Sequence, residues 1–148
     1  MVHNERIIPE IRLLCYHFFM ARFLGIDYGA KRIGIAISDK GCTLAFPKEI
    51  ISNDKNTFEE LAKIIKSESI SEIVIGESLN FSGKPNLVNE KIENFTKELE
   101  LKFFLPIHRQ KEFLTSVEAR RYNDKGRADA KAAALILQRY LDKTNNQK

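Results

Sequence analysis

The stretch FLGIDYGAKRIGIAIS, residues 23–38, decides the fold. Its first five residues form a short apolar run typical of a buried strand, and residues 28–31 have the composition of a turn. From Arg32 to Ser38, isoleucine occupies every second position. This alternation predicts a β-hairpin whose second strand turns one apolar face toward the core.

The opposite face of that second strand carries only small side chains, namely Gly34, Ala36 and Ser38. Another element can therefore approach this face closely. A turn at residues 39–41 leads to a third strand near residues 43–51, which contains Pro47. Because proline cannot donate a hydrogen bond to a neighbouring strand, we expect this strand at the edge of the sheet. Three antiparallel strands thus open the fold.

Helical and strand-like patterns alternate after this point. Apolar residues recur with helical spacing at 58–65 and at 88–99, and Asn56 with Glu59 forms a capping pair before the first of these helices. Short apolar runs predict strands at residues 73–75 and 103–105, and a loop follows the first of them at 77–84.

Two more helices complete the chain. Thr115 and Glu118 cap the first of them, which Gly126 ends, and residues 128–141 form an alanine-rich second helix before a polar tail at 142–148. The predicted order is βββαβαβαα, an α/β arrangement.

The composition is that of one globular domain. The 148 residues are 43% hydrophobic and 30% charged, and no apolar run approaches the roughly 18 residues that cross a bilayer. Cys15 and Cys42 show no metal-binding or redox spacing, which favours a reduced, cytoplasmic protein. The net charge of +4 is concentrated in residues 108–148, which hold ten basic and five acidic residues. This basic third suits a phosphate-rich partner, and a solvated helix face explains it equally well.

Residues 1–22 differ from the rest and lack the cleavage pattern of a signal peptide. They are either an added amphipathic helix or sequence upstream of a start at Met20, because the first strand begins directly after that residue. We expect Met20 to be the start and residues 23–141 to form a single domain.

Two acidic residues stand where chemistry is expected. Asp27 follows a buried strand, so it is either the Asx residue of a hairpin turn or a carboxylate at the strand end where open sheets hold their sites. Asp129 lies in the first turn of the last helix, where free N–H groups and the helix dipole favour a carboxylate. The alanines at 130 and 132–134 let this helix lie against the sheet and carry Asp129 toward Asp27.

Two carboxylates brought together are costly unless a cation or a proton shares the site. With a third carboxylate they would bind Mg²⁺ or Mn²⁺, whose chemistry suits in-line attack on a phosphodiester.

The chain resembles the YqgF family, ribonuclease-H-like proteins described as pre-16S rRNA nucleases and as Holliday-junction resolvases. The resemblance runs from about Phe23 to Leu141. It rests on separate motifs in register: GIDYGAKRIGIAISD at 25–39, LAFP at 44–47, IG at 75–76, LNFSG at 79–83, LTSVEA at 114–119 and DAKAAALILQ at 129–138.

The resemblance implies a ribonuclease-H-like fold, a five-stranded mixed sheet with helices packed around it, and a carboxylate cluster that binds Mg²⁺ or Mn²⁺. Asp27 matches the family's first acidic residue and Asp129 its last. The family's Asp-Glu-Arg-Leu-Thr-Thr becomes KEFLTS at 111–116, which retains Glu112 as the middle carboxylate. Glu77 is a rival for that role, because it stands at a strand end where more distant ribonuclease-H-like nucleases often keep an acid.

The implied activity is that of a metal-dependent nuclease on structured nucleic acid, with processing of the 5′ end of pre-16S rRNA ahead of Holliday-junction resolution. The alternatives are a non-catalytic nucleic-acid-binding module with a weakened metal site, and a sugar-kinase-like ATPase, whose second lobe this length does not supply. The expected partner is structured RNA or branched DNA and not a membrane, and the oligomeric state stays open, with a dimer among the options. Contacts to the phosphate backbone are expected from basic residues in the first turn and near the last two helices: Lys31, Arg32, Arg120, Arg121, Lys125 and Arg127.

Overall fold

A computed structural model of the protein describes residues 21–79, 87–113 and 129–147, with the backbone alone at residues 78, 79, 87–89, 112 and 113. The predicted helix at 115–126 and the candidate start at Met20 lie outside the described residues. The elements in chain order are β1 (Arg22–Tyr28), β2 (Arg32–Ser38), β3 (Ala45–Ser52), α2 (Thr57–Ser67), β4 (Ile70–Leu79), α3 (Leu87–Phe103), β5 (Ile107–Phe113) and α5 (Ala130–Asn146).

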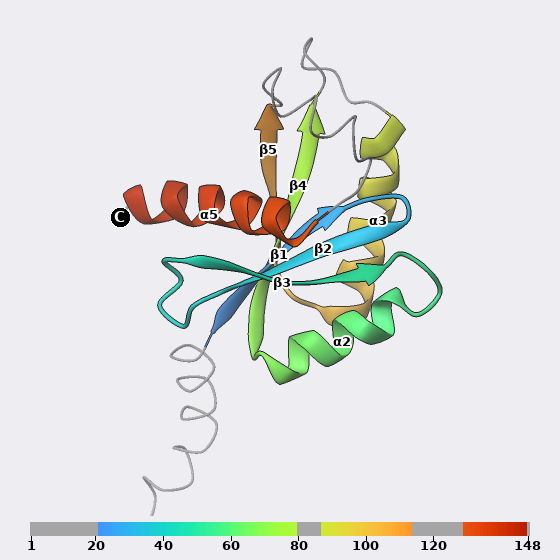
Figure 1. Ribbon diagram of the computed structural model, residues 1–148, viewed down its shortest axis with the longest axis horizontal. Helices are drawn as coiled ribbons and strands as arrows, with labels where there is room; N and C mark the ends of the chain where they lie inside the picture. The colour runs from blue at the N-terminus through green and yellow to red at the C-terminus, as the bar shows by residue number, and fades with distance from the viewer. Residues whose placement is uncertain (1–20, 80–86, 114–128, 148) are drawn as a thin grey trace, which may run out of the picture.

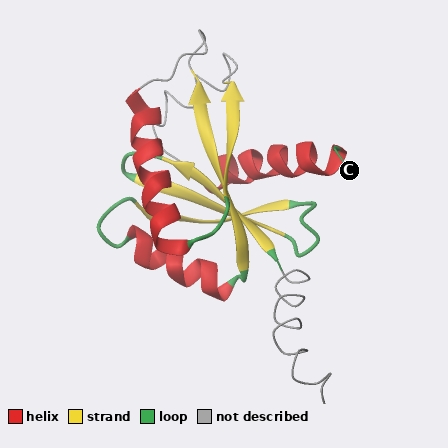
Figure 2. Cartoon of the chain, turned by 180° about the vertical axis from the view of Figure 1, so that it is seen from behind, coloured by secondary structure: helices red, strands yellow, loops and turns green. Residues whose placement is uncertain are grey.

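The five strands form one sheet in the order β3-β2-β1-β4-β5. The β1–β2 and β2–β3 pairs are antiparallel, and the β1–β4 and β4–β5 pairs are parallel. Helix α5 crosses one face of the sheet, whereas α2 and α3 cover the other (Figures 1 and 2). The expected five-stranded mixed sheet is therefore confirmed, and β3 with Pro47 is an edge strand as predicted.

The larger core cluster lies between the sheet and the pair α2 and α3. The alternating isoleucines of β2 contribute to it, and Ile33 and Ile35 are fully buried there. Phe95 of α3 packs against the rings of Tyr28 and Phe58, with ring centroids 4.9 and 5.4 Å apart. This cluster confirms that the period-two pattern of β2 marks a core face.

The second cluster lies under α5, and it depends on small residues. A Cβ built on Gly25 would lie 2.8 Å from the Leu137 Cβ and 2.9 Å from the Ala133 carbonyl oxygen. Such distances are shorter than real side-chain contacts, so α5 can reach β1 only because residue 25 has no side chain. The helix thus packs on the small-residue face of the hairpin, as its alanines predicted.

The fifth strand was predicted in the wrong place. The apolar run at 103–105 does not form a strand, because α3 ends at Phe103. The next residue, Phe104, has a positive φ of 54° and is 86% exposed. The strand itself is Ile107–Phe113 and is mostly polar. As an edge strand it lacks the continuous apolar run of a buried parallel strand, which explains the error.

The ends of three other elements also differ from the prediction. Strand β4 extends to Leu79, so Glu77 lies within it and not in the predicted loop. Asn56 does not cap α2 with its side chain, because its backbone is already helical.

Helix α5 continues through most of the predicted polar tail, to Asn146. The reason is tertiary, since polar side chains near this end bond to the β2–β3 turn. Gln138 Oε1 accepts a hydrogen bond from the Ala45 N–H at 2.8 Å, and Asn145 Nδ2 donates one to the Cys42 carbonyl at 3.0 Å. None of the helices in the described ranges is long and apolar enough to cross a membrane.

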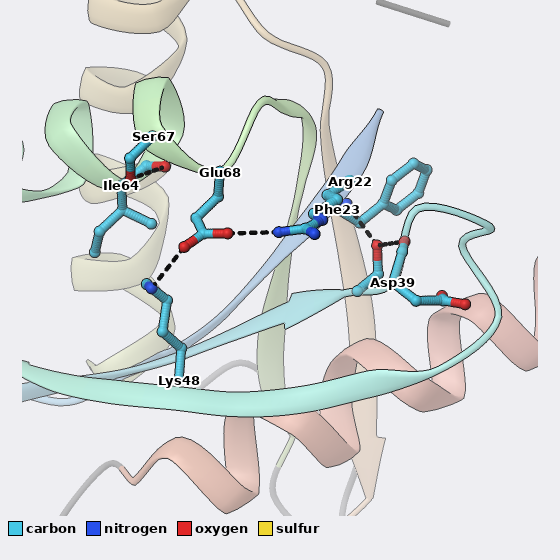
Figure 3. A network of polar contacts seen from close by, with 8 residues as sticks. Arg22, Phe23, Asp39, Lys48, Ile64, Ser67 and Glu68 are labelled. Atoms are coloured by element: carbon cyan, nitrogen blue, oxygen red, sulfur yellow. Dashed lines mark hydrogen bonds and ion pairs between the residues drawn. The ribbon is translucent and has the colours of Figure 1, made fainter. Parts of the chain in front are cut away.

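An ion-pair network joins the start of β1 to β3 and to the end of α2 (Figure 3). Glu68 lies 2.5 Å from Arg22 Nη1 and 2.8 Å from Lys48 Nζ. The hydrogen bond from Lys48 is the largest of the effects that hold the pKa of Glu68 below its usual value of 4.5. Because the folded pKa is the lower one, this stabilisation is complete above the unfolded pKa and is lost as the pH falls through the folded pKa.

We therefore expect Glu68→Gln to lower the free energy of unfolding by about 0.5–1 kcal/mol at neutral pH, in the range of partly exposed ion pairs. The difference from wild type should shrink as the pH is lowered below about 4.5 and should fall with added salt. Urea unfolding of both proteins at several pH values measures this. A difference that is independent of pH would show that the ion pairs do not stabilise the fold.

Candidate functional site

Asp27 is a buried carboxylate near the carboxyl end of β1. Its exposed fraction is 3%, so its charge needs polar partners inside the protein. One partner is the backbone N–H of Asp129, which donates to Asp27 Oδ2 at 3.2 Å across 102 residues of sequence. The two acidic residues that the sequence singled out are therefore neighbours.

Asp129 is the N-cap of α5. Its backbone is extended, with φ −137° and ψ 163°, and its Oδ1 accepts a hydrogen bond from the Ala132 N–H at 2.6 Å. The capping interpretation of Asp129 is thus confirmed, and it does not compete with proximity to Asp27. The cap fixes the carboxylate at the helix start, while the backbone N–H of the same residue bonds to Asp27.

Gly34 makes this approach possible. It is the antiparallel partner of Asp27 on β2, and a Cβ built on it would lie 2.0 Å from the Asp129 carbonyl oxygen and 2.4 Å from its carbon. These are backbone atoms that no side-chain rotation can move. The sequence predicted that another element approaches Gly34 closely, and the structure shows that this element is the N-terminus of α5, at Asp129.

Two carboxylates with hard oxygen donors at the positive end of a helix suit a divalent cation such as Mg²⁺ or Mn²⁺. Mg²⁺ is commonly held by one or two carboxylates together with water and substrate phosphates. Within the described residues, no group of three or more His, Cys, Asp or Glu side chains lies close enough to hold a metal ion.

Glu77 lies on the other face of the sheet from Asp27. It is two residues after Ile75 in β4, and so on the same face as Ile75, which belongs to the core under α3. Its Oε1 is 4.0 Å from Arg109 Nη1. Arg109 also lies 3.5 Å from Glu93 of α3. Glu77 thus belongs to a chain of charges on the α3 face.

Glu112 is in β5 and not in a loop after it, and its register partner is Ser78. Four residues earlier in the same strand, His108 lies on the α5 face, where its ring stacks on Tyr140 with centroids 5.0 Å apart. Successive strand residues alternate between the two faces, so position 112, four residues after His108, is on the same face as His108. This is also the face that carries Asp27. His108 itself bonds to Glu72 through Nε2 at 2.7 Å.

Of the basic residues expected to contact the nucleic-acid backbone, two lie within the described residues and four do not. Lys31 and Arg32 are exposed, and they lie at the end of the β1–β2 connection and at the first position of β2, a few residues after Asp27. The other four, Arg120, Arg121, Lys125 and Arg127, lie outside the described residues.

Sequence reasoning missed Gly25 as a position of close helix approach. The available signal was a glycine inside a buried strand, which often marks such an approach.

This architecture is that of the ribonuclease-H-like fold class. The structure of T. thermophilus RuvC in complex with Holliday junction substrate superposes with a TM-score of 0.51, covering 82% of this chain and 93% of that one at 12% sequence identity.

The sequence comparisons narrow this class to a family. The model of the family described as RuvX, Holliday junction resolvase, matches residues 21–143, and the chain belongs to this family. A protein of Lawsonia intracellularis named "Putative pre-16S rRNA nuclease" is 35% identical over 138 residues, which cover 86% of this chain and 97% of that protein. One with the same name from Ruminiclostridium cellulolyticum is 38% identical over 139 residues, 86% of this chain and 98% of that protein.

We expect Gly34→Ala to separate Asp129 from Asp27. The added methyl group collides with the Asp129 carbonyl, so the start of α5 must move, and the free energy of unfolding should fall by about 1–3 kcal/mol, as in overpacked cores. Chemical denaturation measures the loss. Gly41→Ala is the matched control, because its Cβ would meet its neighbours at an ordinary 3.4 Å or more, and it should stay within about 0.5 kcal/mol of wild type. Equal stability of the two variants would contradict the close approach at Gly34.

Proposed function

We propose that the protein is a metal-dependent nuclease that hydrolyses phosphodiester bonds in structured RNA, and that its reaction is the processing of the 5′ end of pre-16S rRNA. The observation that carries this proposal is the contact between the buried Asp27 and the N-terminus of α5 at Asp129. The names of the two relatives support the choice of substrate.

We further propose that Asp27, Asp129 and Glu112 hold the metal ion. The first two are adjacent through the bond between the Asp129 N–H and Asp27 Oδ2, and Glu112 is preferred to Glu77 because its strand position is in phase with the Asp27 face. When bound, Mg²⁺ or Mn²⁺ would activate a water molecule and stabilise the charge that develops on the phosphate. The protein's own residues keep the carboxylates oriented, since the helix cap restrains Asp129 and the burial of Asp27 excludes bulk water.

A second candidate is Holliday-junction resolution. It is favoured by the description of the family and by the junction in the RuvC structure. The two functions share the same proposed site and differ only in substrate. Incubating the protein with labelled pre-16S rRNA fragments and with a four-way DNA junction, in Mg²⁺, in Mn²⁺ and in EDTA, separates them. Metal-dependent cleavage of the RNA alone supports the first function, and equal binding in EDTA without any cleavage would show a binding module instead.

The two proposed functions of Asp129 can be separated by substitution. We expect Asp129→Asn to keep the helix cap, because asparagine caps as well as aspartate, and yet to reduce cleavage by about 100-fold or more, because one charge on the metal is lost. Asp129→Ala should lose cleavage and also about 1 kcal/mol of unfolding free energy.

Asp27→Asn should behave like Asp129→Asn, with a metal-free melting temperature equal to or above that of wild type, because carboxylate repulsion is relieved. Wild-type cleavage in either asparagine variant would exclude this site.

The third carboxylate is tested by Glu112→Gln with Glu77→Gln as its matched control. We expect only Glu112→Gln to raise the Mn²⁺ concentration needed for half-maximal cleavage, about tenfold or more, since a neutral amide is a weaker ligand for a hard cation. Glu77→Gln should change only the ion pairing on the α3 face. If Glu77→Gln alone raised the metal requirement, Glu112 would be excluded as the ligand.

A further inference from the structure

Asn53, a residue outside the β1–β2 hairpin, bonds to the connection between β1 and β2. Asn53 follows β3, and its side-chain Nδ2 donates a hydrogen bond to the Gly29 carbonyl at 2.8 Å. Its backbone N–H donates a second bond, at 2.9 Å, to the Lys31 carbonyl. Asn53 therefore binds the turn at two of its carbonyl groups, directly after the strand that carries Asp27.

Asn53 is itself fixed by the start of α2. The Thr57 hydroxyl, on a side chain only 1% exposed, donates to the Ser52 carbonyl at 3.0 Å and accepts a hydrogen bond from the Asp54 N–H at 2.9 Å. The residues on both sides of Asn53 are thus anchored to a buried group. The turn is connected in this way to the core of the protein and not only to the hairpin.

We propose that Asn53 is a positioning residue for substrate binding: it fixes the turn so that the exposed cations Lys31 and Arg32 lie along the nucleic-acid backbone that reaches Asp27. The inference rests on the proposed function, because it takes a nucleic acid to be the ligand. Two cations on a restrained turn bind phosphates without first losing conformational freedom, which improves affinity with no added contact. Without the Asn53 side chain, water can satisfy the Gly29 carbonyl, so the fold persists while the turn gains freedom.

The experiment is a double-mutant cycle on binding. Wild type, Asn53→Ala, the pair Lys31→Ala with Arg32→Ala, and the combined variant are titrated in EDTA against a labelled pre-16S rRNA fragment, with fluorescence anisotropy as the readout. Asn56→Ala is the matched control, because this exposed asparagine lies three residues away and its side chain makes no capping bond. Urea unfolding verifies that each variant is folded.

We expect Asn53→Ala to raise Kd by about 3–10-fold and Asn56→Ala to leave it unchanged. The salt dependence of Kd should weaken when Lys31 and Arg32 are replaced and should stay close to wild type in Asn53→Ala, which keeps both charges. In the background without the two cations, Asn53→Ala should have no further effect, because the group that it positions is gone.

An unchanged Kd in Asn53→Ala would overturn the inference. An increase that persists in full without the two cations would also overturn it, because it would show a general structural effect. A wild-type protein that binds the RNA and never cleaves it would contradict the nuclease proposal alone, and the cycle would still decide the part of Asn53. A wild-type protein that does not bind it would overturn both.

Discussion

The close approach of the α5 N-terminus to the sheet is the constraint on which the rest of the structure depends. Position 34 has no room for a side chain, and the Asp129 N–H reaches Asp27 Oδ2 at 3.2 Å. Through this contact, residues 102 positions apart in the chain become neighbours. Because the helix start also carries the cap formed by Asp129, one local geometry fixes the direction of α5 and the relative position of the two acids.

The other half of α5 keeps that geometry in place. Gln138 and Asn145 bond to the turn between β2 and β3 and to the first residue of β3. The helix is therefore tied to the three antiparallel strands at its start and again farther along. A helix held in this way cannot slide along the sheet without breaking hydrogen bonds at its far end. Sites carried by such restrained elements keep their geometry better than sites carried by loops alone.

Acidic residues on the two faces of the sheet have different polar partners. On the α3 face, Arg109 lies between Glu77 and Glu93, so these acids already have a cation nearby. On the α5 face, Asp27 Oδ2 accepts the backbone N–H of Asp129 at the start of a helix, where the partial positive charge favours a carboxylate. The face on which an acid lies therefore decides which partners it meets, more than its distance in sequence does.

Several features of the fold could be predicted because they depend on short-range patterns. The alternating isoleucines of residues 33–37 specify the core face of β2, and Pro47 specifies an edge. Small residues on the hairpin and alanines in the last helix specify a close helix–sheet contact, which is why the neighbourhood of Asp27 and Asp129 could be expected. In each case the residue types themselves determine the geometry.

Other features were decided only by the tertiary structure. Strand β5 has no apolar run because it lies at an edge, so its place came from pairing with β4 and not from its own composition. The face taken by position 112 depends on the register of that pairing, since a shift of one residue in β5 would exchange the two faces. The helical end of α5 depends on the β2–β3 turn, which lies about a hundred residues earlier in the chain. The hairpin, the edge strand β3 and the helix that approaches Asp27 thus follow from local patterns in the chain. Long-range pairing sets which other charged residues share the Asp27 face, because register is a property of two strands together and not of either one alone.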